Sequence, residues 1–430
     1  MRKLFQNLFL SLLFTVMISC KKENSNTDNY VPIVFVHGLY GCGDSYTQMI
    51  QYFRANGYPE NKLFTYDWNT LDFQNAPKNT KPLDDFIKEV KAITGYSKVD
   101  IVGHSLGGNL TFNYCSNASY AENINRLAWF APYLPDRTKI PATDIPTLNI
   151  RTNTDFVVED TSTIPGALNI VIPDKDHNEI ASCEESFVEL FKFFNDGKIP
   201  TTILPETENI LISGRLVSFI ENKVSADNKI EIYEVSSTNG ERINMTPSAT
   251  LFTDSKGYYS NFNAKKNTYY EFQVSTGKTG DRPIHFYFEP FKSSNHMIYL
   301  RTFPPQGSLL NIGFNAIIPF TASQGVSIFF SVSKTVLLNR DALTINGNNC
   351  VNASFAAKEL NTLAYFMFDN NRNAVSDYTS VPLFTGVQSF KGMDFSLPAN
   401  GFSTYNYNGR TLNTFNWPSA SKGLSVAMFY

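Results

Sequence analysis

Short apolar runs alternate with helical patterns between residue 31 and about residue 197. The run at residues 32–36 is apolar at every position, which is typical of a strand buried on both faces of a sheet. The runs that predict strands cover residues 32–36, 63–66, 99–102, 127–130, 147–150 and 168–172. Strands that alternate with helices in this way predict an α/β fold with a parallel, doubly wound sheet.

The stretches between these strands repeat apolar residues every three or four positions, the period of an amphipathic helix. Asp44 can cap the first of these helices, and Gly95 ends the second. The last begins at a capping-box sequence, Ser182-x-x-Glu185. These start and stop signals predict helices on both faces of the sheet.

After residue 198 the pattern changes to alternation of apolar and polar positions, as in residues 229–235 and 268–274. Asn-Gly and Lys-Gly pairs punctuate the region and are typical of hairpin turns. We predict an all-β region of sandwiches or barrels after the α/β part. The expected domains are an α/β domain at residues 31–198, a β-sandwich domain at 199–290 and a second β domain at 291–430.

The N-terminus reads as a targeting segment. Two basic residues precede an apolar run that is short for a membrane span and fits a secretory signal. The run ends at Cys20 in Met-Ile-Ser-Cys, which resembles a bacterial lipobox; an ordinary cleaved signal is the alternative. We therefore expect residues 1–20 to be a lipoprotein signal peptide and residues 21–30 a polar tether. The protein would be exported and held at the bacterial cell envelope, in the outer membrane or at the cell surface, by the lipid on Cys20.

Composition narrows the functional classes. The chain has 430 residues, 36 Phe and 22 Tyr, which suits more than one core and a β-rich interior. A net charge of −3, without a basic run beyond the first residues, argues against nucleic-acid binding. Cys42, Cys115, Cys183 and Cys350 have no C-x-x-C spacing, which argues against zinc. A Cys42–Cys183 disulfide and unpaired thiols are both open.

The strand at residues 99–102 runs directly into Gly103-His104-Ser105-Leu106-Gly107, a G-x-S-x-G motif followed by a helical pattern. A serine hydroxyl is a poor nucleophile unless it is raised into the open and deprotonated by a neighbour. A sharp turn from strand to helix raises it, and flanking glycines allow the crowded backbone that such a turn needs. Ser105 is therefore the candidate nucleophile.

The first strand ends in His37-Gly38-Leu39. Acyl transfer passes through a tetrahedral oxyanion, which two preorganised N–H groups can stabilise. The N–H that follows the nucleophile, on Leu106, is one candidate donor, and the N–H of Leu39 is the best candidate for the other. Alone, a His-Gly pair is more often only a turn. Its position at the end of the opening strand favours the interpretation as an oxyanion loop.

The candidate base is His177, because it follows the last parallel strand, where the chain order serine, acid, histidine requires it. The other histidines are accounted for by the first loop, the serine turn and the β region: His37, His104, His285 and His296.

The candidate acid is Asp155, just beyond the strand at residues 147–150. Asp136, past the preceding strand, is the alternative, and position in the chain favours Asp155. Such a carboxylate holds the tautomer of the imidazole and stabilises the imidazolium.

One pattern in the β region spaces oxygen ligands like a calcium loop: Asp369-x-Asn371-x-Asn373 with Asp377. The match is incomplete, because Ala374 stands where a calcium loop has its central glycine. We expect no cofactor, and this loop is the one metal candidate in the sequence.

These motifs resemble the α/β-hydrolase superfamily, and within it the lipases that join a lipase domain to a C-terminal β domain. The resemblance implies that residues 31–198 are a compact α/β-hydrolase catalytic domain. Further similar segments lie at residues 55–59, 187–202, 269–272 and 366–377.

The resemblance implies a serine carboxylester hydrolase, a lipase or esterase, that acts on acylglycerols or similar esters through an acyl-enzyme. By the same match Ser105 is the nucleophile, His177 the base, and Leu39 and Leu106 the oxyanion donors. An amidase or other acyl hydrolase on the same triad, or a non-catalytic surface binding lipoprotein, are the alternatives.

The sequence departs from those lipases in two places. Their acid follows the preceding strand, where this chain reads Phe130-Ala131-Pro132 without a carboxylate, so the role passes to Asp155. Only a short stretch separates Asp67 from Pro82, where the lipases carry a long lid. We therefore expect little lid.

Overall fold

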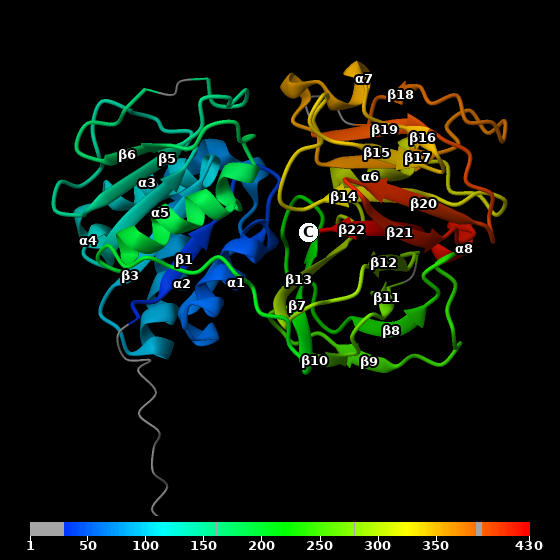
Figure 1. Cartoon of the computed structure of the whole chain (residues 1–430), viewed down its shortest axis with the longest axis horizontal. Coiled ribbons are helices and arrows are strands. Elements are labelled where there is room, and N and C mark those ends of the chain that lie inside the picture. The colour runs from blue at the N-terminus through cyan, green and yellow to red at the C-terminus, as the bar shows by residue number, and fades with distance from the viewer. Residues whose placement is uncertain (1–29, 160–161, 279, 384–388) are drawn as a thin grey trace, which may run out of the picture.

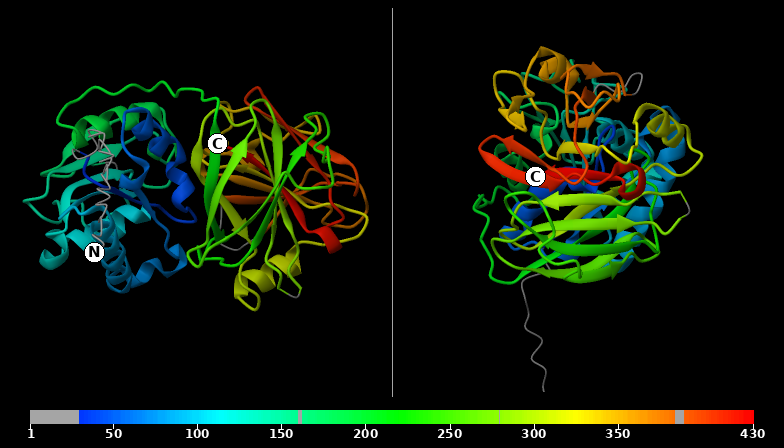
Figure 2. Two further views of the ribbon diagram at one scale, coloured as in Figure 1. Left: turned by 90° about the horizontal axis from the view of Figure 1, so that it is seen from below. Right: turned by 90° about the vertical axis from the view of Figure 1, so that its right-hand side faces the viewer.

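The computed structural model describes residues 30–159, 162–278, 280–383 and 389–430. Two lobes lie side by side, a first lobe of residues 30–194 and a second of residues 210–430 (Figure 1). The linker between them passes along one side of both lobes (Figure 2, left). Cys20, the expected signal peptide and all but the last residue of the expected tether lie outside the described residues. No helix in the described ranges has the length and apolar character that crossing a bilayer requires.

The first lobe is built on a parallel sheet of six strands in the order β2-β1-β3-β4-β5-β6. The strands are β1 (Ile33–Val36), β2 (Leu63–Tyr66), β3 (Val99–His104), β4 (Ile124–Phe130), β5 (Thr147–Arg151) and β6 (Leu168–Val171). The predicted parallel sheet is confirmed, and each of the six expected strands is present.

Helices cover both faces of this sheet, as a doubly wound fold requires. Along β1, Ile33 and Phe35 join the core under α1 and α5, whereas Val34 and Val36 join the core under α2 and α3. A strand buried on both faces has no polar face, which explains the continuous apolar run. The helices are α1 (Thr47–Ala55), α2 (Ala76–Thr94), α3 (Leu106–Cys115), the short α4 (Ala118–Ala121) and α5 (Glu184–Phe194).

Two expected helix caps are wrong, because both polar side chains are used elsewhere. Asp44 lies in a 3-10 turn before α1, and its carboxylate binds Arg301 of the second lobe at 2.8 Å. The N-cap of α5 is Cys183, without a side-chain capping bond. The hydroxyl of Ser182 donates instead to the carbonyl of Ser333, also in the second lobe, at 2.8 Å.

The second lobe stacks three sheets. The largest has nine strands in the order β18-β19-β17-β14-β22-β12-β11-β8-β9, and the others are β10-β7-β13 and β16-β15-β20-β21. The strands are β7 (Ile210–Ser218), β8 (Lys229–Val235), β9 (Ala249–Phe252), β10 (Tyr258–Ala264), β11 (Tyr269–Ser275), β12 (Ile284–Phe288), β13 (Asn295–Thr302), β14 (Ser327–Ser331), β15 (Leu343–Ile345), β16 (Asn348–Asn349), β17 (Ala364–Phe368), β18 (Ser380–Val381), β19 (Phe390–Asp394), β20 (Phe402–Tyr407), β21 (Arg410–Phe415) and β22 (Leu424–Phe429). Short helices α6 (Leu309–Ile317), α7 (Ala353–Ala356) and α8 (Ser419–Lys422) connect them.

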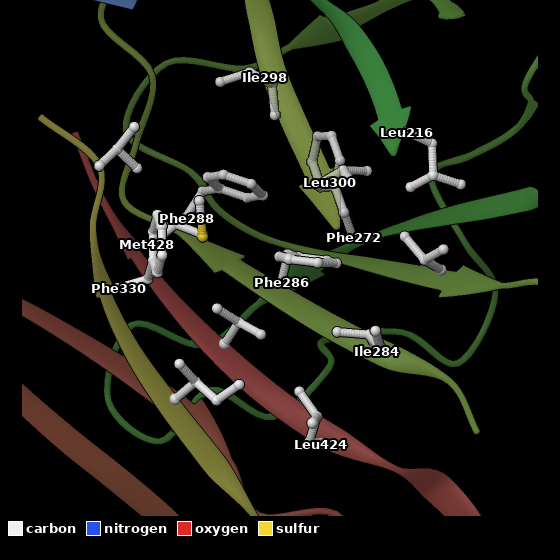
Figure 3. Close-up of a cluster of buried hydrophobic side chains, with 14 of the residues drawn as sticks. Leu216, Phe272, Ile284, Phe286, Phe288, Ile298, Leu300, Phe330, Leu424 and Met428 are labelled. Carbon is white, nitrogen blue, oxygen red and sulfur yellow. The ribbon is translucent and has the colours of Figure 1, made fainter. Parts of the chain in front are cut away.

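The nine-stranded sheet is buried on both faces. On β22, Leu424 and Met428 face the core shared with the three-stranded sheet, and Ala427 and Phe429 face the core shared with the four-stranded sheet. Figure 3 shows the first of these cores, with Leu424 and Met428 across from Leu300 of β13. Burial of alternate residues against two different sheets fixes the register of this strand.

The expected boundary at residue 290 falls within one continuous sheet. β12, before that position, pairs in parallel with β22 at the end of the chain, and β14 pairs with the other edge of β22. The two expected β domains therefore share the nine-stranded sheet.

The disulfide alternative is wrong. Cys42, Cys115, Cys183 and Cys350 are all free and buried. The Cys42 thiol donates to Asp44 at 3.0 Å. Burial raises the pKa of the Cys183 thiol to about 11, so it stays protonated at neutral pH.

Candidate active site

Ser105 stands at the corner between β3 and α3 in a strained conformation, with φ 53° and ψ −119°. Such angles are costly for a residue with a side chain and persist only where surrounding contacts enforce them. Here the Ser105 N–H donates to the carbonyl of Phe130 at 3.1 Å. The Ser105 carbonyl accepts from the N–H groups of Gly108 and Tyr133, both at 2.9 Å. These bonds hold the corner in place.

The glycines of the G-x-S-x-G motif are required by close backbone contacts. A Cβ on Gly107 would lie 2.1 Å from the carbonyl oxygen of Val36 on β1. A Cβ on Gly103 would lie 2.6 Å from the carbonyl oxygen of Gly107. The helix can therefore leave the sheet at this sharp angle only when both positions lack a side chain.

His177 and Asp155 form a buried pair. Nδ1 of His177 lies 2.8 Å from Oδ2 of Asp155, and their side chains are 5% and 2% exposed. Oδ1 of Asp155 accepts from the N–H groups of Val157 at 2.8 Å and Val158 at 2.9 Å. Burial opposes ionisation of Asp155, but the contacts with His177 and these N–H groups outweigh it and hold its pKa below the ordinary value. The ionised carboxylate favours hydrogen on Nδ1 of His177, and in the neutral form of an imidazole with hydrogen on Nδ1 the lone pair lies on Nε2.

Asp136, the alternative acid, is engaged elsewhere. Its Oδ1 accepts from the N–H of Thr138 at 2.8 Å and from the hydroxyl of the same residue at 2.6 Å. Lys139 lies 3.6 Å from its other oxygen. The structure thus brings Asp155, and not Asp136, to His177.

His104 links the serine corner to the histidine loop, a role that its place in the motif did not suggest. Its Nε2 lies 2.8 Å from the carbonyl oxygen of His177, and the two ring centroids are 4.8 Å apart. Burial, together with the neighbouring His177, lowers the pKa of His104 to about 3. The ring is therefore neutral, and because a carbonyl only accepts, its hydrogen is on Nε2.

Ser105 directly follows His104 in the chain, so this contact places the backbone of the His177 loop beside the serine corner. Within the described ranges, the Ser105 hydroxyl makes no hydrogen bond with His177. In free enzymes the bond between nucleophile and base is often long or misaligned and tightens when substrate binds.

The loop after β1 lies against the nucleophile, because a Cβ on Gly38 would be 2.8 Å from Cβ of Ser105. Leu39 is 39% exposed. Among the described residues, the N–H groups of Leu39 and Leu106 have no hydrogen-bond partner. Leu106 is the first residue of α3, where an N–H has no acceptor in its own helix and the helix dipole favours negative charge.

His37 fixes the orientation of this loop. Its Nδ1 lies 2.9 Å from the carbonyl oxygen of Gly38, and its Nε2 accepts from the N–H of Trp68 at 3.2 Å. Burial outweighs the nearby Asp67 and lowers the pKa of His37, so the ring is neutral with hydrogen on Nδ1. In a trans peptide the carbonyl and the next N–H point in opposite directions. Holding the Gly38 carbonyl toward His37 therefore turns the Leu39 N–H away from it.

The second lobe holds the loop that carries His177. Oδ2 of Asp176 accepts from Arg340 at 2.7 Å and from the N–H of Thr335 at 3.2 Å. The side chain of Asn178 donates to Asn361 at 3.0 Å. Residues on both sides of His177 are thus anchored by the second lobe, which the sequence did not indicate.

In the candidate calcium loop, the oxygen atoms accept hydrogen bonds from the protein. Asp369 accepts from the N–H groups of Asn373 at 3.1 Å and Ala374 at 2.9 Å. The Asn371 amide donates to Asp377 at 2.9 Å and to Asp394 at 3.1 Å. In the described part of the chain, no group of three or more His, Cys, Asp or Glu is placed to hold a metal. Calcium at this loop is therefore a candidate that only the spacing of the sequence suggests.

Three family models match parts of the chain. Residues 30–119 match the model described as lipase (class 2), and residues 208–305 match the lipase C-terminal domain. A further model, of a C-terminal domain, matches residues 334–429.

Several solved structures match part of this chain. An α/β hydrolase, MGS-MChE2, from a lagoon sediment metagenome of Mar Chica, Morocco, is 20% identical, with a TM-score of 0.30 over 39% of this chain and 91% of its own. Lipase BlEst2 of Bacillus licheniformis is 16% identical, with a TM-score of 0.32 over 38% of this chain and 92% of its own. Lipase B of Aspergillus fumigatus is 12% identical, with a TM-score of 0.33 over 41% of this chain and 55% of its own.

The lipase models thus match one segment in each lobe, and the parallel sheet of six strands with helices on both faces fits an α/β-hydrolase core.

Proposed function

We propose that the protein hydrolyses carboxylic esters, of acylglycerols or similar lipids, through an acyl-enzyme on Ser105. The observation that carries the proposal is the 2.8 Å pair of His177 and Asp155, linked through His104 to the serine corner. A neutral imidazole with a free Nε2, oriented by an ionised carboxylate, is what a serine nucleophile needs for activation.

In the proposed reaction, Oγ of Ser105 attacks the ester carbonyl carbon and its proton passes to Nε2 of His177. The carbonyl electron pair moves onto oxygen, where the N–H groups of Leu39 and Leu106 stabilise the charge. The intermediate collapses, and the alcohol leaves with the proton from His177. Water then attacks the acyl-enzyme by the same route, which releases the carboxylic acid and restores Ser105. Asp155 stabilises the imidazolium in both halves.

The test is hydrolysis of p-nitrophenyl butyrate by the wild type and by Ser105→Ala. We expect the variant to lose at least about a thousandfold in kcat, because the remaining members of a triad do not replace the nucleophile. Ser116→Ala is the matched control, since Ser116 is an exposed serine just past the other end of α3. Equal rates for wild type and Ser105→Ala would remove the enzymatic proposal.

The substrate class rests on the lipase models that match residues 30–119 and 208–305. Esters of increasing acyl length would measure the preference for lipid-like substrates. p-Nitroanilides of the same acids separate an esterase from an amidase, and faster cleavage of the anilides would contradict the proposal.

We also propose that the protein is exported and anchored in the bacterial cell envelope by lipid on Cys20, on the strength of the N-terminal sequence. Expressed in bacteria with labelled palmitate, the wild type should carry label and stay with membranes, whereas Cys20→Ser should not. Label on both proteins would contradict it.

A further inference from the structure

Asn222 belongs to the second lobe but its side chain ends in the first. It lies in the turn between β7 and β8, with φ 53°, a left-handed conformation that asparagine tolerates better than most residues. Its N–H donates to the carbonyl of Ser218 at 3.1 Å, and the residue is buried. The turn therefore presents the amide inward, at the lobe boundary.

The amide nitrogen of Asn222 contacts three acceptors of the first lobe. It donates to the carbonyl oxygens of Gly41 at 2.7 Å and Trp68 at 3.0 Å, and it lies 3.3 Å from Nε2 of His37. Carbonyl oxygens only accept, so the nitrogen and not the oxygen of the amide must face them. The unprotonated Nε2 of neutral His37 is an acceptor as well.

These contacts join the two ends of the loop that carries Leu39. His37 begins this loop and binds the Gly38 carbonyl through Nδ1. Gly41 ends it, and its N–H donates to the same carbonyl at 3.2 Å. One amide thus fixes the His37 ring and the Gly41 backbone, and both fix the peptide whose N–H is on Leu39.

Trp68 completes the arrangement. Its backbone N–H donates to Nε2 of His37, and its indole N–H donates to the His37 carbonyl at 3.0 Å. Because Asn222 binds the Trp68 carbonyl as well, the three groups around the His37 ring are held in one network.

We propose that Asn222 is a positioning residue for the oxyanion hole, supplied by the β lobe, which sets the direction of the Leu39 N–H through His37 and Gly41. The inference rests on the proposed function, since it assigns a task to that same site. The β lobe then completes the catalytic machinery instead of serving only as an appended domain.

Lobe adhesion alone does not require this residue. Arg215 binds Asp67 at 2.5 Å and Arg301 binds Asp44 at 2.8 Å across the same boundary. Tyr40 of the first lobe packs on Phe390 of the second lobe, with ring centroids 5.7 Å apart. Those contacts hold the lobes together, so removing one amide should change catalysis more than docking.

Two variants test the proposal. Asn222→Gly keeps the left-handed backbone and removes the amide. Asn222→Asp keeps the shape but turns acceptors toward two carbonyls. With p-nitrophenyl butyrate we expect kcat to fall about ten- to a hundredfold in both, less than the loss of a direct oxyanion donor, with KM within about twofold. Binding of an alkyl trifluoromethyl ketone, whose serine adduct places an oxyanion in the hole, should weaken in parallel with kcat/KM.

Asn267→Gly is the matched control, because Asn267 is an exposed asparagine of the same lobe in the same left-handed conformation. It should keep wild-type kcat and inhibitor affinity. Activity is measured well below the thermal midpoint of every variant.

Wild-type kcat in the Asn222 variants, or a rise in KM with kcat retained, would overturn the inference. Loss of the folded state in both variants would overturn it too, by assigning Asn222 to lobe docking. A wild type without Ser105-dependent turnover would instead overturn the proposed function, so the two failures are distinct.

Discussion

At the scale of single residues, chain order was enough to find the candidate nucleophile and base but not to choose the acid. Asp136 and Asp155 both follow a strand of the sheet, and position alone only favoured the second. What separates them is the local loop: the N–H groups of Val157 and Val158 hold Asp155 inward, while Thr138 holds Asp136 in an exposed turn. Such contacts depend on backbone geometry that residue order does not specify.

Because Asp155 and not Asp136 pairs with His177, we expect removal of the two carboxylate charges to affect activity differently. Asp155→Asn should lower kcat by about a thousand- to ten-thousandfold, because an amide no longer requires hydrogen on Nδ1 of His177 and does not stabilise the imidazolium. Asp136→Asn should stay within about twofold, since its partners are Thr138 and Lys139. The measurement is kcat for p-nitrophenyl butyrate, and a larger loss from Asp136→Asn would reverse the assignment of the acid.

At the scale of elements, the strands of the first lobe could be predicted because short, mainly apolar runs alternate with helical patterns, and β1, which is buried on both faces, is apolar throughout. Helix starts were harder to predict: Asp44 and Ser182 have the chemistry of caps but bind the second lobe. The pairing of β22 with β12 and β14 was also missed, because strand partners 140 and 98 residues apart in the chain leave no local pattern.

The corner between β3 and α3 depends on a missing side chain. Gly107→Ala would place a Cβ 2.1 Å from the Val36 carbonyl oxygen, so α3 must move away from β1. We expect a loss of about 3 kcal/mol or more in the free energy of unfolding, in the range of overpacking plus a displaced backbone, and a loss of activity with it. Urea unfolding of wild type and variant measures this. A Gly107→Ala protein of wild-type stability would show that the corner has more room than the structure gives it.

Asp100 on β3 should make the first lobe sensitive to pH. Burial outweighs the hydrogen bond from Asn125 and raises the pKa of Asp100 from 3.8 to about 7. The unfolded chain therefore releases this proton first, so the folded state loses stability as pH rises from about 4 to 7 and loses no more above that. Asp100→Asn removes this loss, which is at most about 4 kcal/mol.

The thermal midpoint of Asp100→Asn minus that of the wild type should therefore be larger at pH 8 than at pH 5. Asp85→Asn is a suitable control, since Asp85 is exposed and pairs with Lys81 on α2. A constant difference between wild type and Asp100→Asn at the two pH values would contradict the assigned titration.

At the scale of the whole molecule, the two lobes meet around the candidate site. Asn222 reaches the loop of Leu39, Arg340 holds the loop of His177, and Arg301 binds Asp44 behind them. The periodicity of apolar residues predicted an α/β part followed by a β part. It did not predict that the second lobe anchors loops of the first, because contacts between lobes depend on how the two folded surfaces meet.

The ion pairs across the lobe boundary should differ sharply in their contribution to stability. Asp44 is fully buried, and its Oδ2 has no hydrogen-bond partner in the described part of the chain, so Arg301 is its counter-charge. Arg301→Met leaves a buried carboxylate alone and should lower the free energy of unfolding by about 3–5 kcal/mol. Lys256→Met removes the exposed pair with Glu89, where solvent screens both charges, and should cost less than about 1 kcal/mol.

Urea unfolding of both variants provides the comparison, and Arg301→Met combined with Asp44→Leu should recover most of the loss, because no charge is then left buried. If burial did not govern these contacts, the two single variants would unfold at similar urea concentrations and the double variant would be no more stable than Arg301→Met. The guanidinium of Arg301 also lies 4.7 Å from the ring centroid of Phe330. If Arg301 stabilised the protein only by packing on this ring, the double variant would not recover stability, so recovery shows that Arg301 acts as the counter-charge of Asp44.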